Sequence, residues 1–200
     1  MKTISRVYDT YAQARNAVGA VEAAGVPSSE VSLVANKYVS DKYENVEDVS
    51  KASEGAGTGA GIGGAVGGGA GLLAGLGMLA IPGLGPVVAA GWLAALAVGA
   101  VAGAATGGLV GALIGSGISD DDAHVYSESV RRGGTLVSVR AEDGEAAHIQ
   151  AVLDRYKPID PVQRGADYRK SGWKTFDPKA PAYKPSESEI ERIRREDLAA

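Results

Sequence analysis

The 200-residue chain contains no cysteine. This absence excludes disulfide bonds, a thiolate nucleophile and a cysteine-ligated zinc site, and it fits a reducing compartment. The N-terminus also lacks the basic region and the continuous apolar run of a secretory signal. We therefore expect the N-terminal part of the chain to remain in the cytoplasm.

Charge is missing from one long interval of the sequence. Between Gly55 and Ser119 there is no Asp, Glu, Lys, Arg or His, although this interval holds 22 of the 29 glycines. The chain is thus divided into a charged N-terminal part, an uncharged middle and a charged C-terminal part. The formal net charge of −4 provides no strongly basic face, so nucleic acid is not expected as a partner.

Both charged flanks carry patterns of helices and strands. Strands are predicted at 2–8, 30–36 and 135–141, and helices at 9–25, 119–134 and 144–156, with Asp9 or Thr10 and Ser119 as N-caps. Neither flank has enough strands for a sheet of its own. The sequence therefore predicts the α+β class, with a small three-stranded split-βαβ (ferredoxin-like) sandwich built from residues 1–54 and 119–157 and interrupted by residues 55–118.

Glycine recurs at every fourth position in two rows within the uncharged segment, with Ala95 filling one gap in the second row. Between the rows lies a strong helix breaker, which predicts a helical hairpin with legs at 56–81 and 87–117. The first row is Gly55, Gly59, Gly63, Gly67, Gly71 and Gly75; the second is Gly91, Gly99, Gly103, Gly107, Gly111 and Gly115; the turn is Pro82, Gly83, Gly85 and Pro86.

The glycine rows favour a helical hairpin that other helices or lipid stabilise. Glycine costs about 1 kcal/mol relative to alanine in a helix, and the legs would span about 39 and 46 Å against a bilayer core of roughly 30 Å. Rows of glycine also let helix backbones approach closely. We therefore expect a membrane-inserted hairpin that homo-oligomerises in the bacterial inner membrane, with lipid as a partner and both termini cytoplasmic. A soluble assembly that buries the hairpin between subunits and a flexible linker are the alternatives.

The C-terminal residues 158–200 are predicted to form an extended, proline-rich tail that ends in a short helix. Five of the eight prolines lie here, together with Tyr168, Trp173, Phe176 and Tyr183 in a polar setting. Exposed aromatic side chains are typical anchors at protein interfaces, so Trp173 and Phe176 are predicted to dock on a sandwich, their own or a neighbour's. A capping box that begins at Ser186 predicts a short terminal helix.

Three stretches resemble the bacterial general stress proteins of the 17M-like type: LAIPGLGPVVAAG, GGLVGALIGSGISDDDAHVYSESVRRGGTLVSVR and SGWKTFDPKAPAY. The resemblance implies an N-terminal α/β domain joined to a glycine-zipper hydrophobic segment, in a protein that is stress-associated and membrane-linked. It implies no established activity, cofactor or catalytic residue, so no site residue is carried over.

No pattern in the sequence predicts an enzyme. Gly59, Gly61 and Gly64 match a dinucleotide-binding pattern, but no acidic residue follows at the required distance. The acidic run at Asp120 is interpreted as the first turn of a helix, where carboxylates favour the dipole, although His124 nearby also permits a metal hypothesis. We expect no catalytic residue, no cofactor and no metal.

Three functions compete on this sequence. The leading hypothesis is a non-enzymatic, stress-associated membrane protein that homo-oligomerises through the glycine rows and has a structural or protective role. A second is a soluble homo-oligomer or ligand sensor, because small sandwiches of this type often bind ligands between subunits. A third is a pore-forming oligomer, although the uncharged segment holds no ionisable residue that could select an ion.

Overall fold

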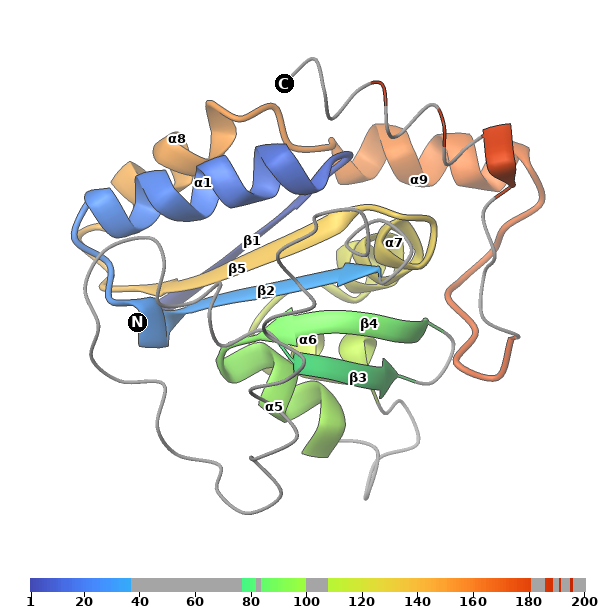
Figure 1. Ribbon diagram of the computed structural model, residues 1–200, viewed down its shortest axis with the longest axis horizontal. Coiled ribbons are helices and arrows are strands. Elements are labelled where there is room, and N and C mark those ends of the chain that lie inside the picture. Colours follow the sequence, from blue (N-terminus) through green and yellow to red (C-terminus); the bar gives the residue numbers. More distant parts are fainter. Residues whose placement is uncertain are drawn as a thin grey trace.

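The computed structural model describes residues 1–36, 77–81, 84–99, 108–180, 186–188, 191 and 195 (Figure 1). The first glycine row, from Gly55 to Gly75, lies outside these residues. So do Gly103 and Gly107 of the second row and Pro82 and Gly83 of the turn.

One antiparallel sheet of five strands organises the described residues, which confirms the mixed α+β class. Its order is β1-β5-β2-β4-β3, and every neighbouring pair is antiparallel. The strands are β1 (Lys2–Tyr8), β2 (Val31–Asn36), β3 (Gly77–Ile81), β4 (Gly85–Ala90) and β5 (Thr135–Ala141). Strands from both flanks therefore meet in one sheet, since β5 lies between β1 and β2.

Helix α1 (Tyr11–Ala23) connects β1 to β2 and passes over one face of the sheet (Figure 1). It begins at Thr10, whose side chain accepts a hydrogen bond from the Gln13 amide while the Gln13 side chain caps Thr10 in return. This capping box satisfies two backbone donors at the helix start. Because β1 and β2 both run antiparallel to β5, they are parallel to each other.

The first face of the sheet is covered by α1 and α8 (Ala146–Asp154), which lie side by side above it (Figure 1). Val18 of α1, Leu33 of β2 and Ile149 of α8 are buried in one apolar cluster on this face. Burial of each such side chain stabilises the fold by about 1.5–3 kcal/mol.

The opposite face carries α5 (Trp92–Gly99), α6 (Leu109–Gly115) and α7 (Asp120–Arg131). Leu93, Leu113 and Tyr126 from these helices share a second apolar cluster with Leu136 of β5. Helix α7 begins after Ser119, whose hydroxyl accepts a hydrogen bond from the Asp122 amide, as the sequence predicts.

The predicted helical legs are wrong where the structure describes their ends on either side of the turn. Residues Gly77–Ile81 and Gly85–Ala90 form the paired strands β3 and β4, and β4 continues the sheet by pairing with β2. Val87 and Val88 favour a strand through their branched side chains, and the exposed edge of β2 supplies the backbone partners that a helix would otherwise provide. The chain reverses direction between Ile81, the last residue of β3, and Gly85, the first residue of β4, so strands and not helices flank the reversal.

The prediction of a transmembrane segment and an inner-membrane location is also wrong. None of the helices in the described part of the chain is long and apolar enough to cross a bilayer. Helices α5 and α6 have eight and seven residues, whereas a span needs about 20.

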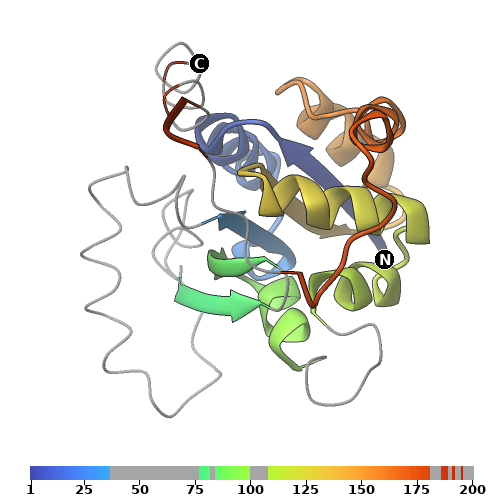
Figure 2. The same ribbon diagram turned by 90° about the vertical axis from the view of Figure 1, so that its right-hand side faces the viewer.

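The chain after α8 wraps around the edge of β1 and returns over α7. Ile159 donates its amide to the Val7 carbonyl at 2.8 Å, and α9 (Pro161–Lys170) then packs on α7. Residues 171–180, which we call the strap, continue from α9 across α7 towards the helices α5 and α6 (Figure 2).

Candidate functional site

A row of three buried serines crosses the second face of the sheet. Ser5, Ser138 and Ser32 occupy directly paired positions on β1, β5 and β2, and all three are buried. The Ser5 and Ser138 hydroxyls lie 2.7 Å apart, and Ser32 donates to the Ala90 carbonyl at 2.7 Å. These bonds satisfy hydroxyl groups that would be costly to bury alone.

A second polar row lies beside the serines on the same face, two residues away along each strand. Thr3 of β1 pairs with Arg140 of β5, and Arg140 forms a 2.7 Å ion pair with Glu30. The Arg140 guanidinium also lies 4.7 Å from the ring centre of Trp92, whose indole donates to the Glu30 carbonyl at 3.2 Å. The start of α5 is thereby attached to the polar part of the sheet.

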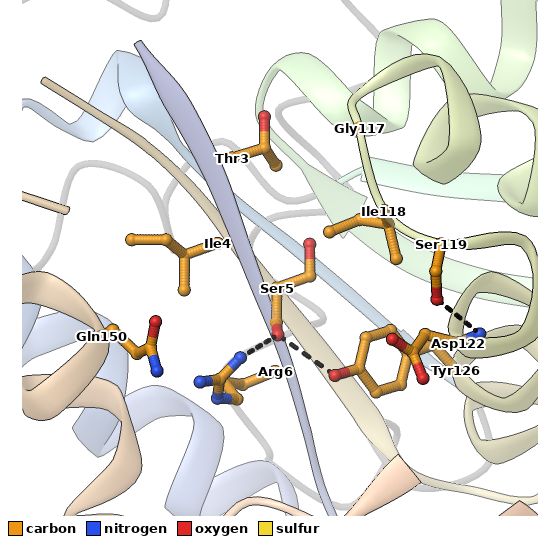
Figure 3. Close-up of a pocket in the computed structure, with 10 residues that line it drawn as sticks. All are labelled: Thr3, Ile4, Ser5, Arg6, Gly117, Ile118, Ser119, Asp122, Tyr126 and Gln150. Atoms are coloured by element: carbon orange, nitrogen blue, oxygen red, sulfur yellow. Dashed lines mark hydrogen bonds between the residues drawn. The ribbon is translucent and has the colours of Figure 1, made fainter. Parts of the chain in front are cut away.

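A pocket of about 210 Å³ lies at the outer end of these rows, against the edge strand β1 (Figure 3). Its walls are β1 from Thr3 to Arg6, the loop 117–119, the first turns of α7 and Gln150 of α8. Both the loop and Gln150 flank the same strand edge (Figure 3), so the pocket is a short trough along β1.

Arg6 and Tyr126 fix one end of the pocket through the Ser5 carbonyl. Arg6 donates to this carbonyl at 2.9 Å and forms a 2.6 Å ion pair with Asp154. Burial disfavours the guanidinium charge, but the hydrogen bond and charge of Asp154 outweigh this effect and raise the pKa of Arg6. The Tyr126 hydroxyl donates to the same carbonyl at 3.3 Å, and burial raises the pKa of Tyr126 to about 12. Both groups therefore keep their protons at neutral pH.

Asp122 supplies the free charge of the pocket. Its amide bonds to Ser119, but its carboxylate has no ion-pair partner within the described residues. Because Arg6 is neutralised by Asp154, the pocket carries a net charge of about −1. Its chemistry is hydrogen bonding around one carboxylate, which suits a neutral or cationic ligand.

The metal hypothesis at the start of α7 gains no support from the described residues. His124 lies 3.8 Å from Asp120 and accepts or donates a 2.9 Å hydrogen bond with Thr175 of the strap. No group of three potential ligands comes together among residues that the structure describes. His124 instead connects α7 to the strap.

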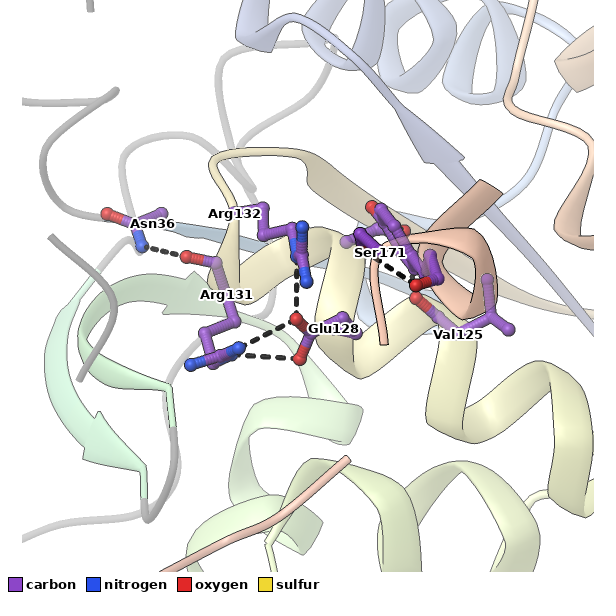
Figure 4. A network of polar contacts seen from close by, with 8 residues as sticks. Asn36, Val125, Glu128, Arg131, Arg132 and Ser171 are labelled. Atoms are coloured by element: carbon purple, nitrogen blue, oxygen red, sulfur yellow. Dashed lines mark hydrogen bonds and ion pairs between the residues drawn. The ribbon is translucent and has the colours of Figure 1, made fainter. Parts of the chain in front are cut away.

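A second polar network surrounds the buried carboxylate of Glu128 on α7 (Figure 4). Arg131 binds Glu128 with two hydrogen bonds of 2.8 and 2.7 Å, and Arg132 adds a third at 2.6 Å. The guanidinium of Arg132 also lies 4.5 Å from the ring centre of Tyr168 on α9. All three charges are engaged within the network, which points to a structural role in joining α7 to α9.

The aromatic residues predicted as anchors lie on the strap. Phe176 is 4 % exposed and belongs to the second apolar cluster. Trp173 is half-buried, with its ring centre 5.7 Å from that of Tyr168. Its indole nitrogen is buried and has no hydrogen-bond partner among the residues that the structure describes. Both residues dock on their own chain in this structure.

The described glycines of the second row occupy different environments. Gly91 has a φ of +88° before α5, and a Cβ there would lie 2.3 Å from the Val31 carbonyl oxygen. Gly99 ends α5, and Gly111 and Gly115 belong to α6. Gly85 and Pro86 begin β4. The structure therefore does not place these glycines on one helical row.

The sequence prediction missed the two polar rows and the pocket. A signal was present, because Thr3 and Ser5, and likewise Ser138 and Arg140, alternate with apolar residues at the period of a strand. Comparison with protein-family models, curated proteins and solved structures finds no match to this chain.

Proposed function

We propose that this chain is a non-enzymatic protein that self-associates through helices α5 and α6. The observation that carries this proposal is the character of α5, whose eight residues are Trp, Leu, Ala, Ala, Leu, Ala, Val and Gly. A helix that is apolar on every side is normally buried on every side. Leu93 and Ala97 face the sheet cluster, but Leu96 is 49 % exposed.

Helix α6 extends this apolar surface. Ile114 is 36 % exposed, and a Cβ built on Gly115 meets no described residue within 4 Å beyond its chain neighbours and the backbone of its own helix. An uncovered glycine beside exposed aliphatic side chains lets another backbone approach closely, which is the role proposed for the glycine rows. The surface formed by Leu96, Ile114 and Gly115 is called the α5–α6 surface below.

The stress association remains a proposal that rests on the resemblance to the general stress proteins of the 17M-like type. For the finer fold, we propose that β1, α1, β2 and β5 constitute a split-βαβ unit of the ferredoxin-like type. The order β1-β5-β2 supports this proposal. The helical form of the first glycine row remains a prediction about residues outside those described.

A matched pair of charge substitutions tests self-association. Leu96→Lys places a cation on the α5–α6 surface, whereas Val162→Lys places one on α9 at a residue that is 76 % exposed. Both changes leave the apolar clusters intact, so both variants are expected to fold. Sedimentation velocity of the full chain should show an assembly for the wild type and for Val162→Lys, and monomer for Leu96→Lys.

Two results would contradict the proposal. A wild-type chain that sediments as a monomer at micromolar concentration would exclude stable self-association. Equal masses for the two lysine variants would show that an assembly forms through some other surface. Circular dichroism of each variant establishes that any loss of mass is not a loss of fold.

A ligand sensor is the second candidate function, and the pocket beside β1 is the observation that favours it. Asp122 and the edge-strand residues from Thr3 to Arg6 line this pocket together. This function is compatible with self-association, because the pocket and the α5–α6 surface involve different residues.

A further inference from the structure

Strand β1 forms an open edge of the sheet where it borders the pocket. Among the strands that the structure describes, β5 alone pairs with it. The carbonyls of Ser5 and Val7 point away from β5, because they accept bonds from Tyr126 and from Ile159. Backbone groups alternate in direction along a strand, so the amide and carbonyl of Thr3 and the amide of Ser5 also point outward.

The open edge has a defined length. The Val7 carbonyl accepts a 2.8 Å hydrogen bond from the Ile159 amide, and the Ser5 carbonyl accepts hydrogen bonds from Arg6 and Tyr126. The Thr3 amide and carbonyl and the Ser5 amide have no hydrogen-bond partner within the described residues. Three backbone groups therefore face the trough in a row, which matches what one short extended segment can use.

We propose that the trough binds a short extended peptide that adds an antiparallel strand to β1 and places a lysine or arginine side chain at Asp122. The peptide residue opposite Thr3 exchanges two backbone hydrogen bonds with it. The carbonyl of the peptide residue opposite Ser5 accepts a hydrogen bond from the Ser5 amide. Strand addition of this kind derives affinity from the main chain and specificity from alternate side chains.

The position of the cation follows from the alternation of side chains. Directly paired residues of antiparallel strands project to the same face of a sheet. Thr3 and Ser5 project to the face that carries α7, where Asp122 lines the pocket. A peptide residue paired with either of them therefore projects towards Asp122, while the residue between them projects towards Gln150 and α8.

The same alternation excludes β1 of a second copy as the occupant. The cations of β1 are Lys2 and Arg6, at even positions. In an antiparallel pair of β1 strands, the outward-facing odd residues pair with one another. Lys2 and Arg6 would then lie on the face of α8, and Asp122 would remain without a cation.

Three peptides test the proposal on the full chain. The probes are acetyl-Thr-Val-Lys-Val-Thr-amide, its Glu analogue and a form methylated on the backbone nitrogen of lysine. Binding is followed by amide chemical shifts in two-dimensional NMR. The lysine peptide should shift the Thr3 and Ser5 amides and bind about fivefold tighter than the glutamate peptide, as expected for a partly exposed ion pair. In this probe the lysine pairs with Thr3, so methylation of its backbone nitrogen should remove binding because it removes the donor to the Thr3 carbonyl.

Two variants on adjacent residues sharpen this test. Asp122→Asn should reduce the preference for lysine over glutamate to about one, while Asp121→Asn, whose side chain does not line the pocket, should keep it. The proposal is overturned if the peptides do not bind at millimolar concentration or if shifts avoid Thr3 and Ser5. It is also overturned if the preference persists in Asp122→Asn. None of these results bears on sedimentation of the unliganded chain.

Discussion

The two faces of the sheet differ in how completely they are covered. Among the described residues, the buried side chains on the face of α1 and α8 are apolar or aromatic, apart from Thr135 at the start of β5 and Thr10 at the start of α1. On the face of α5, α6 and α7 the apolar cluster adjoins two polar rows, the pocket and the exposed Leu96. On this comparison, the first face mainly stabilises the fold, whereas the α5–α6 surface and the Asp122 side of the pocket lie on the second.

The largest loss of stability is expected at Gly91, which links β4 to α5 and packs against β2. Gly91→Ala combines a φ of +88° with a Cβ 2.3 Å from the Val31 carbonyl oxygen. Strain and overlap together should lower the free energy of unfolding by about 4 kcal/mol. Urea denaturation measures this change. Gly19→Ala, where the added Cβ meets no atom within 4 Å, is the control and should not destabilise the protein.

The closed face should be more sensitive to truncation than the exposed α5–α6 surface. Leu33→Ala removes a fully buried side chain from the first cluster and should cost about 3 kcal/mol. Leu96→Ala should cost less than about 0.5 kcal/mol when measured on monomer. Similar losses in urea denaturation would show that Leu96 is covered within the chain and would remove the contrast between the faces.

The strap is expected to contribute an intermediate amount to the free energy of unfolding. Phe176→Ala removes a buried ring, but the strap can detach locally, so the expected cost is about 2 kcal/mol. Detachment should also shift the Trp173 fluorescence to longer wavelength under native conditions. Lys174→Ala, at an exposed neighbouring position, is the control. An unchanged spectrum in Phe176→Ala would indicate that Trp173 is held by Tyr168 alone.

Among the buried side chains, the smallest loss of stability is expected at Tyr126, and this loss depends on pH. Tyr126→Phe removes the bond to the Ser5 carbonyl and should cost about 1 kcal/mol at pH 8. Burial raises the pKa of Tyr126 from 10.0 to about 12. Its contribution is therefore fully present below pH 10 and is lost as the pH rises to about 12. The stability difference between wild type and variant should narrow over that window, and a constant difference would contradict the account.

Local signals were sufficient for the elements of the flanks. The N-caps at Thr10 and Ser119 and the alternation in β1 and β5 are encoded within a few residues, so these elements could be predicted. Residues 77–90 could not, because their glycine, alanine and valine composition suits a buried helix or a strand. The choice depends on the unpaired edge of β2, which is distant in sequence.

The pocket was harder to predict for a related reason. Thr3 and Ser5 are ordinary polar residues of a strand until β5 pairs with β1 and α7 brings Asp122 beside them. Their spacing indicates only that they share a face. That the Thr3 backbone and the Asp122 carboxylate have no partner among the described residues follows from tertiary structure.

The most direct test of self-association through the α5–α6 surface is sedimentation of two leucine variants. Among the described residues, neither Gly115→Leu nor Gly19→Leu introduces a Cβ within 4 Å of any atom beyond the chain neighbours and the backbone of its own helix, so both chains should keep their fold. The account predicts that Gly115→Leu dissociates the assembly to monomer, because leucine holds the partner backbone away, while Gly19→Leu sediments like the wild type. An assembly of unchanged mass in Gly115→Leu would contradict the account.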